Sequence, residues 1–150
     1  MKRVLAFAPA SIGNFAAGFD VLGAAIAPLE GAPLGDQVDI SLAARDAFEA
    51  VGPFAGRLPG RAQDNLAMKS CAVFAQAWGR PLPPLAIRLV KNLPVGSGLG
   101  SSSATVVATL AALDALLEAG LGEAALLRAG GEVEGLGCGA GHLDNVAPSL

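Results

Sequence analysis

The segment Asn92-Leu-Pro-Val-Gly-Ser-Gly-Leu-Gly-Ser-Ser-Ser-Ala104 contains three glycines at alternate positions, followed by three serines. An alternating apolar pattern (Leu85, Ile87, Leu89) leads into it, and a long apolar run over residues 105–119 follows it. Alternation is typical of a strand, and a long apolar run of a buried helix. The sequence therefore predicts a strand, a glycine-rich loop and the start of a helix.

The composition of this loop suits an anion. Gly96, Gly98 and Gly100 lack Cβ atoms, so the backbone can turn tightly and bring its N–H groups close to a bulky ligand. Residues 101–104 form the expected first helical turn, where unpaired N–H groups and the positive end of the helix dipole converge. The serine hydroxyls could cap the helix, bond a phosphate oxygen or ligate Mg²⁺. We expect a phosphate site, although such loops are also used as plain tight connections.

Two common nucleotide-binding motifs do not fit this loop. The Walker A motif requires a lysine after its last glycine, and no lysine follows Lys91. The dinucleotide pattern Gly-x-Gly-x-x-Gly fails because, counted from Gly96, Ser101 stands where the last glycine belongs. A phosphate loop of another type is therefore indicated.

Three segments resemble motifs of the GHMP kinases, the superfamily of galactokinase, homoserine kinase, mevalonate kinase and phosphomevalonate kinase. The first is the loop itself, and the resemblance assigns to the nucleotide Pro94, Val95, Gly96, Ser97, Gly98, Leu99, Gly100, Ser101, Ser102, Ser103 and Ala104. The other two resemble motifs of the homoserine kinases: Ala8-Pro-Ala-Ser-Ile-Gly-Asn-Phe-Ala-Ala-Gly-Phe-Asp-Val-Leu-Gly23 and His142-Leu-Asp-Asn-Val-Ala-Pro148. Three ordered motifs spread over nearly the whole chain are more specific than one glycine loop.

The resemblance implies a two-layer α+β fold in which a mixed β-sheet packs against helices, with residues 1–150 forming a GHMP-kinase N-terminal ATP-binding domain. A doubly wound parallel sheet is the alternative, because a strand, glycine loop and helix can also begin a βαβ unit. Homoserine kinases are longer than this chain, and their C-terminal domain contributes further substrate groups. We therefore expect these residues to lack part of the acceptor site and to expose apolar surface.

The activity implied by the resemblance is transfer of the γ-phosphoryl group of ATP to the side-chain hydroxyl of L-homoserine. The product, O-phospho-L-homoserine, serves threonine biosynthesis, and the implied cofactors are ATP and Mg²⁺. Two alternatives remain: another GHMP kinase, such as a mevalonate-pathway kinase, or a non-catalytic nucleotide-binding module. The implied partner is a small molecule, and a homodimer is a further option.

A magnesium site needs little from the protein, because Mg²⁺ prefers oxygen ligands and keeps several waters. The resemblance assigns the metal to Ser102 and Glu134, because in homoserine kinases a glutamate precedes the Asp-Asn of the third motif by an interval that matches Glu134 and Asp144. Glu132 is out of that register. Without the motif, either glutamate would be taken for a solvated residue at a helix end.

The substrate contacts implied by the resemblance are Asn14, Asp20, His142 and Asp144, with Asn145 near the reacting hydroxyl. Asp20 could bind the substrate ammonium, but by itself it could equally cap a turn. His142 is the sole histidine and suits either a general base or a structural hydrogen bond. Asn145 cannot take a proton at neutral pH, so catalysis would rest on positioning and on charge neutralisation at the γ-phosphate.

The remaining segments predict further elements. Strand patterns occupy residues 4–9, 21–28, 36–42 and 48–51, with a loop over 10–18. One helix begins after Asp64 as N-cap and stops at Gly79, in a region that the resemblance places near the nucleotide base. A long helix after the loop should end at Gly120, and another should cover residues 122–134 before a glycine-rich turn at 135–141.

Composition excludes several classes. A chain of 150 residues with 53% hydrophobic content can bury a core, but its longest apolar run meets Asp114 too soon to span a membrane. The charge of −3, from 10 basic and 13 acidic residues spread along the chain, gives no footprint for nucleic acid. Cys71 and Cys138 lack metal-type spacing, and two cysteines make no disulfide framework. Because Pro9 cuts short the apolar run after Met1, no secretory signal is predicted, and a cytoplasmic protein is expected.

Overall fold

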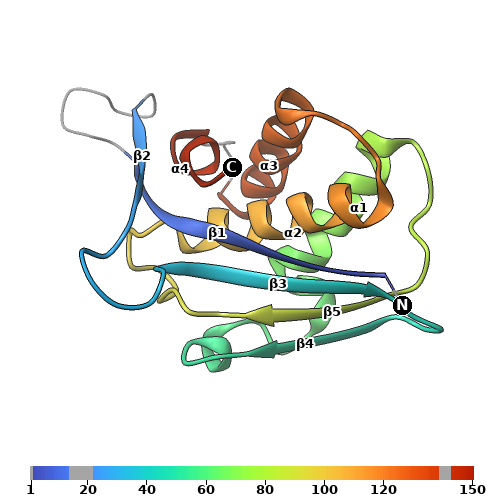
Figure 1. Cartoon of the computed structure of the whole chain (residues 1–150), viewed down its shortest axis with the longest axis horizontal. Coiled ribbons are helices and arrows are strands. Elements are labelled where there is room, and N and C mark those ends of the chain that lie inside the picture. Colours follow the sequence, from blue (N-terminus) through green and yellow to red (C-terminus); the bar gives the residue numbers. More distant parts are fainter. Residues whose placement is uncertain (1, 14–21, 139–142) are drawn as a thin grey trace.

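The computed structural model describes residues 2–13, 22–138 and 143–150. It is an α+β fold in which the helices gather on one side of a five-stranded mixed sheet (Figure 1). The strands are β1 (Arg3–Gly13), β2 (Gly23–Ile26), β3 (Gly35–Leu42), β4 (Ala47–Val51) and β5 (Leu85–Val90). The helices are α1 (Leu66–Trp78), α2 (Ser101–Leu117), α3 (Glu123–Cys138) and α4 (Leu143–Ser149), with the 3₁₀ turns η1 (Ala55–Arg57) and η2 (Ala62–Asp64).

The sheet order is β2-β1-β3-β5-β4. Within the described residues every neighbouring pair is antiparallel except β4 and β5, which are parallel and are connected through α1. A parallel pair needs such a crossover, because its strands run in the same direction. The mixed sheet confirms the predicted α+β class and rules out the doubly wound parallel alternative.

Strand β1 is longer than its sequence pattern predicts. A loop was expected from residue 10 onward, but the strand continues to Gly13 because it changes partners. Residues 3–9 pair with β3, and residues 10–13 pair with β2 on the other edge. Pro9, which has no N–H to donate, lies opposite Gly35 at the end of the β3 ladder. The proline therefore marks a change of partner and not the end of the strand.

The core lies between the sheet and the helices, with α2 at its centre. Along β1 the fully buried Ala8 and Ala10 face the helices, whereas Leu5 (64% exposed) and Phe7 (44% exposed) lie on the uncovered face. Helix α2 contacts β1, β3 and the three other α-helices, which explains why its apolar residues show no single face. Each fully buried leucine, such as Leu110, contributes about 1.5–3 kcal/mol relative to exposure.

Two helix boundaries in the first half of the chain test the predicted caps. The N-cap of α1 is Asn65 and not Asp64, because the Asn65 side chain accepts a hydrogen bond of 3.0 Å from the Ala67 amide. Asp64 belongs to η2 and pairs with Arg61. Gly79 ends α1 in the left-handed region, with a φ of 72°, as predicted.

The later helices depart further from prediction. Helix α2 ends at Leu117 with Glu118 in the left-handed region, before the expected Gly120. Helix α3 continues past Glu134 to Cys138, through the first part of the stretch predicted to turn. The third motif forms the short helix α4, which no pattern predicted. Among the helices that the structure describes, none is long and apolar enough to cross a bilayer.

Candidate active site

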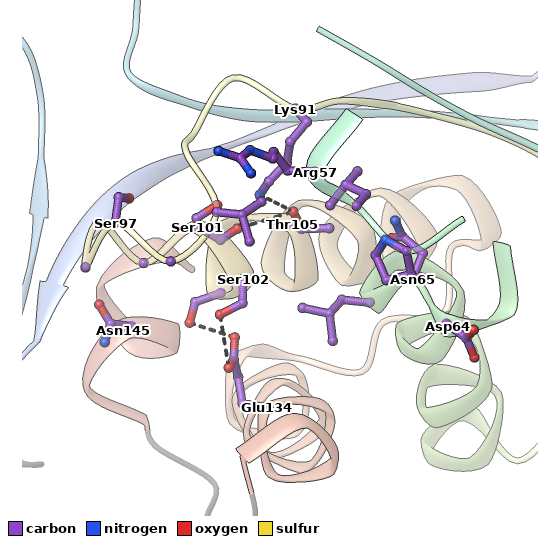
Figure 2. A pocket seen from close by; sticks show the side chains of 18 of the residues that line it. Arg57, Asp64, Asn65, Lys91, Ser97, Ser101, Ser102, Thr105, Glu134 and Asn145 are labelled. Carbon is purple, nitrogen blue, oxygen red and sulfur yellow. Dashed lines mark hydrogen bonds between the residues drawn. The ribbon is translucent and has the colours of Figure 1, made fainter. Parts of the chain in front are cut away.

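A cleft of about 740 Å³ opens at the start of α2. The glycine loop and the first turn of α2 form one wall, α3 and the start of α4 form the second, and η1 with the start of α1 forms the third (Figure 2). Such a volume suits a nucleotide-sized or drug-sized ligand.

The three glycines of the loop all adopt left-handed backbone conformations, with φ of 74° at Gly96, 75° at Gly98 and 62° at Gly100. Side-chain-bearing residues rarely take this conformation. A Cβ added at Gly96 or Gly98 would meet no atom within 4 Å, but one added at Gly100 would overlap Ser11 Oγ. The first two glycines are thus required by conformation, and the third by conformation and packing together.

The amides at the start of α2 are available to a ligand. The N-cap, Gly100, provides no side-chain cap. Within the described part of the chain, the amides of residues 101–103 donate to no other group, and the first amide of this helix start that does is Ala104 N, to Gly100 O at 2.9 Å. These unpaired donors coincide with the positive end of the helix dipole, which favours an anion there.

The three serine hydroxyls have different partners. Ser101 Oγ donates to the Leu93 carbonyl at 3.2 Å and so anchors the loop. The buried Ser103 donates to Glu134 Oε1 at 2.9 Å. Ser102 is exposed, and its Oγ lies 3.2 Å from Glu134 Oε2. Figure 2 shows both contacts converging on the Glu134 carboxylate inside the cleft.

The two candidate glutamates of α3 face different surroundings. Glu134 is only 8% exposed and lines the cleft. Glu132, two residues earlier, is exposed to solvent. Residues two apart on a helix lie on different faces, so only Glu134 can share a ligand with Ser102.

A buried ion pair stabilises the glycine loop and the start of α2. Lys91 is 2% exposed and pairs with the fully buried Asp36. Its Nζ also donates to Ser101 O at 2.6 Å and to Thr105 Oγ1 at 2.9 Å. Burial lowers the pKa of Lys91, and the Asp36 carboxylate opposes that shift. The ammonium group therefore ties the end of β5 to the first turn of α2.

Asp36 completes this network. Its Oδ1 accepts from the amides of Asn92 at 2.9 Å and Leu93 at 3.0 Å, and its Oδ2 accepts from Thr105 Oγ1 at 2.8 Å. A buried charge is tolerated when it is paired and hydrogen-bonded in this way. The sequence analysis did not assign a role to Lys91 or Asp36. The signal that could have indicated them was an acidic residue at the start of one strand and a lysine at the end of another.

Helix α4 brings two predicted residues to the cleft. Asp144 is 5% exposed, and among the described residues its Oδ1 has no hydrogen-bond partner. Asn145 Oδ1 accepts from Ser11 Oγ at 3.0 Å. A Cβ at Gly13 would overlap the Asp144 carboxylate, so the close approach of α4 to β1 depends on that glycine.

The wall formed by η1 and α1 contributes residues that no motif indicated. Arg57, Asp64 and Asn65 line the cleft, and all three are labelled in Figure 2. No ion pair involves Arg57 among the residues that the structure describes. Among the described residues it is therefore an exposed cation that lines the cleft without an ion-pair partner.

The predicted site residues divide into three groups. Those that line the cleft are Val95, Gly96, Ser97, Gly98, Gly100, Ser101, Ser102, Ser103, Glu134, Asp144 and Asn145. Those that do not line it are Pro94, Leu99 and Ala104. The Leu99 carbonyl accepts from Ser11 N at 3.1 Å, and Ala104 is fully buried. Those outside the described residues are Asn14, Asp20 and His142.

An uncapped helix start beneath a glycine loop, facing a hydroxyl and a carboxylate, has the features expected of the phosphate site of a phosphotransferase. The sequence profile of "GHMP kinases N terminal domain" matches residues 65–150. The chain belongs to the GHMP kinase family.

Solved structures agree with this assignment. Homoserine kinase from Cytophaga hutchinsonii is 35% identical with a TM-score of 0.84, over 99% of this chain and 46% of that enzyme. A Listeria monocytogenes protein provisionally named homoserine kinase is 26% identical with a TM-score of 0.68, over 97% of this chain and 46% of that protein. Methanococcus jannaschii mevalonate kinase, at 15% identity and a TM-score of 0.74 over 98% of this chain and 51% of that one, shares the fold. The chain thus spans about half the length of these relatives.

Proposed function

We propose that this chain forms the nucleotide-binding part of a homoserine kinase, which transfers the γ-phosphoryl group of ATP to the side-chain hydroxyl of L-homoserine. The observation that carries the proposal is the pairing of Ser102 with Glu134 beside an open row of amides, opposite Asp144 and Asn145. The 35% identity to the Cytophaga hutchinsonii enzyme over 99% of the chain supports the choice of acceptor.

The phosphates of ATP would lie against the amides of residues 96–103, where the helix dipole adds favourable potential. Arg57 has no partner among the described ion pairs. Its guanidinium would bind the remaining negative charge of the phosphates. The buried Lys91 acts through the loop, because it holds the Ser101 carbonyl and so fixes the first turn of α2.

The donor set fits Mg²⁺. The hydroxyl of Ser102 and the carboxylate of Glu134 are hard oxygen ligands 3.2 Å apart, and both line the cleft. Ser103 holds the other carboxylate oxygen and so fixes its orientation. When bound, the metal ion neutralises phosphate charge.

The acceptor side of the proposal rests on α4. Asp144 Oδ1, which has no hydrogen-bond partner among the described residues, suits the ammonium group of an amino acid, and Asn14, Asp20 and His142 remain predicted contacts. The acceptor oxygen forms a bond to the γ-phosphorus while the bond from that phosphorus to the bridging oxygen breaks and ADP leaves. The hydroxyl proton passes to phosphate or water, because Asn145 offers no basic atom.

The test uses the complete gene product that contains residues 1–150. ADP release is coupled to a spectroscopic readout with L-homoserine, mevalonate or galactose as acceptor, and we expect release that depends on homoserine. Glu134→Ala should lower kcat at least about 100-fold, because charge stabilisation at the phosphates is lost. Glu132→Ala is the matched control, since that exposed neighbour on α3 should leave kcat unchanged.

Other outcomes would contradict the proposal. Release that depends only on mevalonate would make the protein another GHMP kinase. ATP binding without release for any acceptor, equal in wild type and Glu134→Ala, would make it a non-catalytic nucleotide-binding module.

A further inference from the structure

Two glycines lie opposite each other at the end of the ribbon that β1 and β2 form. Gly13 ends β1, Gly23 begins β2, and the two residues are register partners in this antiparallel pair. Residues directly opposite each other in such a pair present the same face of the sheet. The ribbon therefore has a patch without side chains, which we call the glycine notch (Gly13 and Gly23), and α4 packs against this ribbon.

Asp144 occupies the glycine notch. A Cβ added at Gly13 would overlap Oδ2 of the Asp144 carboxylate, and a Cβ added at Gly23 would overlap the main-chain oxygen of Asp144. Neither glycine has a φ in the left-handed region, so backbone conformation does not require glycine at either position. The glycines are required by packing, and the nearest atoms at both positions belong to Asp144.

Helix α4 has no room to move away from the notch. On another side it packs against α3, and Figure 1 shows it between β2 and α3. A Cβ at Gly130 of α3 would overlap Val146, and one at Gly131 would lie 2.7 Å from Leu143. Because close-packed elements have few voids into which they can shift, a side chain added in the notch would displace the Asp144 carboxylate itself.

One oxygen of this carboxylate remains for another partner. Asp144 is 5% exposed and lines the cleft. Its Oδ2 faces Gly13, whereas its Oδ1 is buried and has no hydrogen-bond partner among the described residues. A buried carboxylate oxygen without a donor is costly. The arrangement therefore indicates a ligand that donates a hydrogen bond to Oδ1.

We propose that Gly13 and Gly23 are positioning residues, which hold the Asp144 carboxylate where its Oδ1 accepts a hydrogen bond from the ammonium group of the acceptor. This inference rests on the proposed function. A contact that is equally strong in the ground state and in the transition state lowers KM and leaves kcat unchanged. The glycine notch therefore sets the affinity for the acceptor and not the rate of phosphoryl transfer.

The first test is Gly13→Ala in the complete gene product. The added methyl group displaces the carboxylate, so KM for L-homoserine should rise at least about tenfold while kcat stays within about threefold. The dissociation constant of ADP, measured by calorimetry, should stay within about twofold, because the start of α2 is unchanged. Gly60→Ala is the matched control, since a Cβ there meets no atom within 4 Å, and its KM should equal that of the wild type. An unchanged KM in Gly13→Ala would overturn the proposal.

A double-mutant cycle with Asp144→Ala separates positioning from general support of the fold. Without the carboxylate, Gly13→Ala should raise KM no further. Its loss of melting temperature should also shrink, because the nearest clash is removed, whereas Gly23→Ala meets the main chain and should lose the same in both backgrounds. An equal rise in KM from Gly13→Ala in both backgrounds would overturn the proposal.

Asp144→Glu tests the same placement even if Gly13→Ala does not fold. This variant keeps the charge and lengthens the side chain by one methylene, so its oxygens leave the position that the notch sets and KM should again rise at least about tenfold. A wild-type KM would show that charge alone suffices and would overturn the proposal. If the wild type shows no homoserine-dependent turnover, both proposals fail, whereas homoserine-dependent turnover with a KM insensitive to these substitutions removes this inference alone.

Discussion

Lys91 and Asp36 form an ion pair next to the glycine loop, with both side chains almost completely buried. The pair holds three segments together, because its atoms also bond the amides before the loop and the first turn of α2. The shape of the glycine loop and of the start of α2 therefore depends on this buried pair.

Lys91→Met should lower the free energy of unfolding by about 3–5 kcal/mol, because it leaves the Asp36 carboxylate buried without its partner. Urea denaturation measures the change. Adding Asp36→Asn to Lys91→Met should recover part of the loss, since the unpaired charge is removed. Lys2→Met, which breaks the exposed pair with Glu118, is the control and should change little. A loss no larger for Lys91→Met than for Lys2→Met would contradict the structural role.

Gly100→Ala and Gly96→Ala should behave differently. Both place a side chain at positive φ, which costs about 1 kcal/mol, but only the Cβ at position 100 overlaps Ser11. Thermal unfolding should therefore show the larger loss for Gly100→Ala. Gly96→Ala should mainly weaken nucleotide binding, measured by calorimetry with ADP. Equal stabilities would mean that the contact between the loop and β1 does not constrain position 100.

Arg57→Ala should weaken ATP binding roughly fivefold at low ionic strength, because a partly exposed cation near phosphates contributes on the order of 1 kcal/mol. The effect should shrink as salt is added. Arg61→Ala is the matched control, because Arg61 already pairs with Asp64 and does not line the cleft. The same loss of affinity in both variants would indicate a general charge effect and no specific contact of Arg57.

The ion pair between Arg3 and Asp39 should make the stability of the protein depend on pH. The Arg3 guanidinium holds the pKa of the Asp39 carboxyl below its ordinary value of 3.8. A carboxylate with a lowered folded-state pKa stabilises the protein above its unfolded pKa and loses that contribution as pH falls through the folded pKa. The difference in melting temperature between wild type and Arg3→Met should thus be present at neutral pH and vanish in acid below 3.8. In an Asp39→Asn background, Arg3→Met should show no such pH dependence.

Cys71 should resist alkylation while the protein is folded. The thiol is 7% exposed, and burial raises its pKa to about 12. At pH 8 the reactive thiolate is then on the order of one molecule in ten thousand. Iodoacetamide labelling, followed by mass spectrometry of the peptide containing Cys71, should become fast only in denaturant. Rapid labelling of the native protein would contradict this burial.

Local sequence patterns predicted the helices and strands whose conformation depends on residues adjacent in the sequence. The alternation from Leu85 to Leu89 and the glycines of the loop indicated β5 and the start of α2, because strand period and positive φ are local properties. The resemblance of the third motif also placed Asp144 and Asn145 at the site. Patterns could not predict α4 as a helix, because its seven residues include Pro148 and are held by packing against β1 and β2.

The features that the sequence did not predict share one physical cause: each depends on a contact between residues far apart in the chain. The bond between Ser11 and Asn145 joins residues 134 positions apart, and the pair of Lys91 with Asp36 joins residues 55 apart. Residue type alone does not indicate such partners. The same applies to β1, whose continuation past Pro9 depends on β2 as a second partner.

The contact between Ser11 and Asn145 also sets an order for assembly. Because Ser11 and Asn145 lie near opposite ends of the residues described, a ribosome releases the glycine loop before α4 can dock onto β1. A nascent chain that ends after α3 would contain the glycine loop but not α4. In the proposed kinase, the loop that would bind the nucleotide is therefore synthesised before the helix that would contact the acceptor.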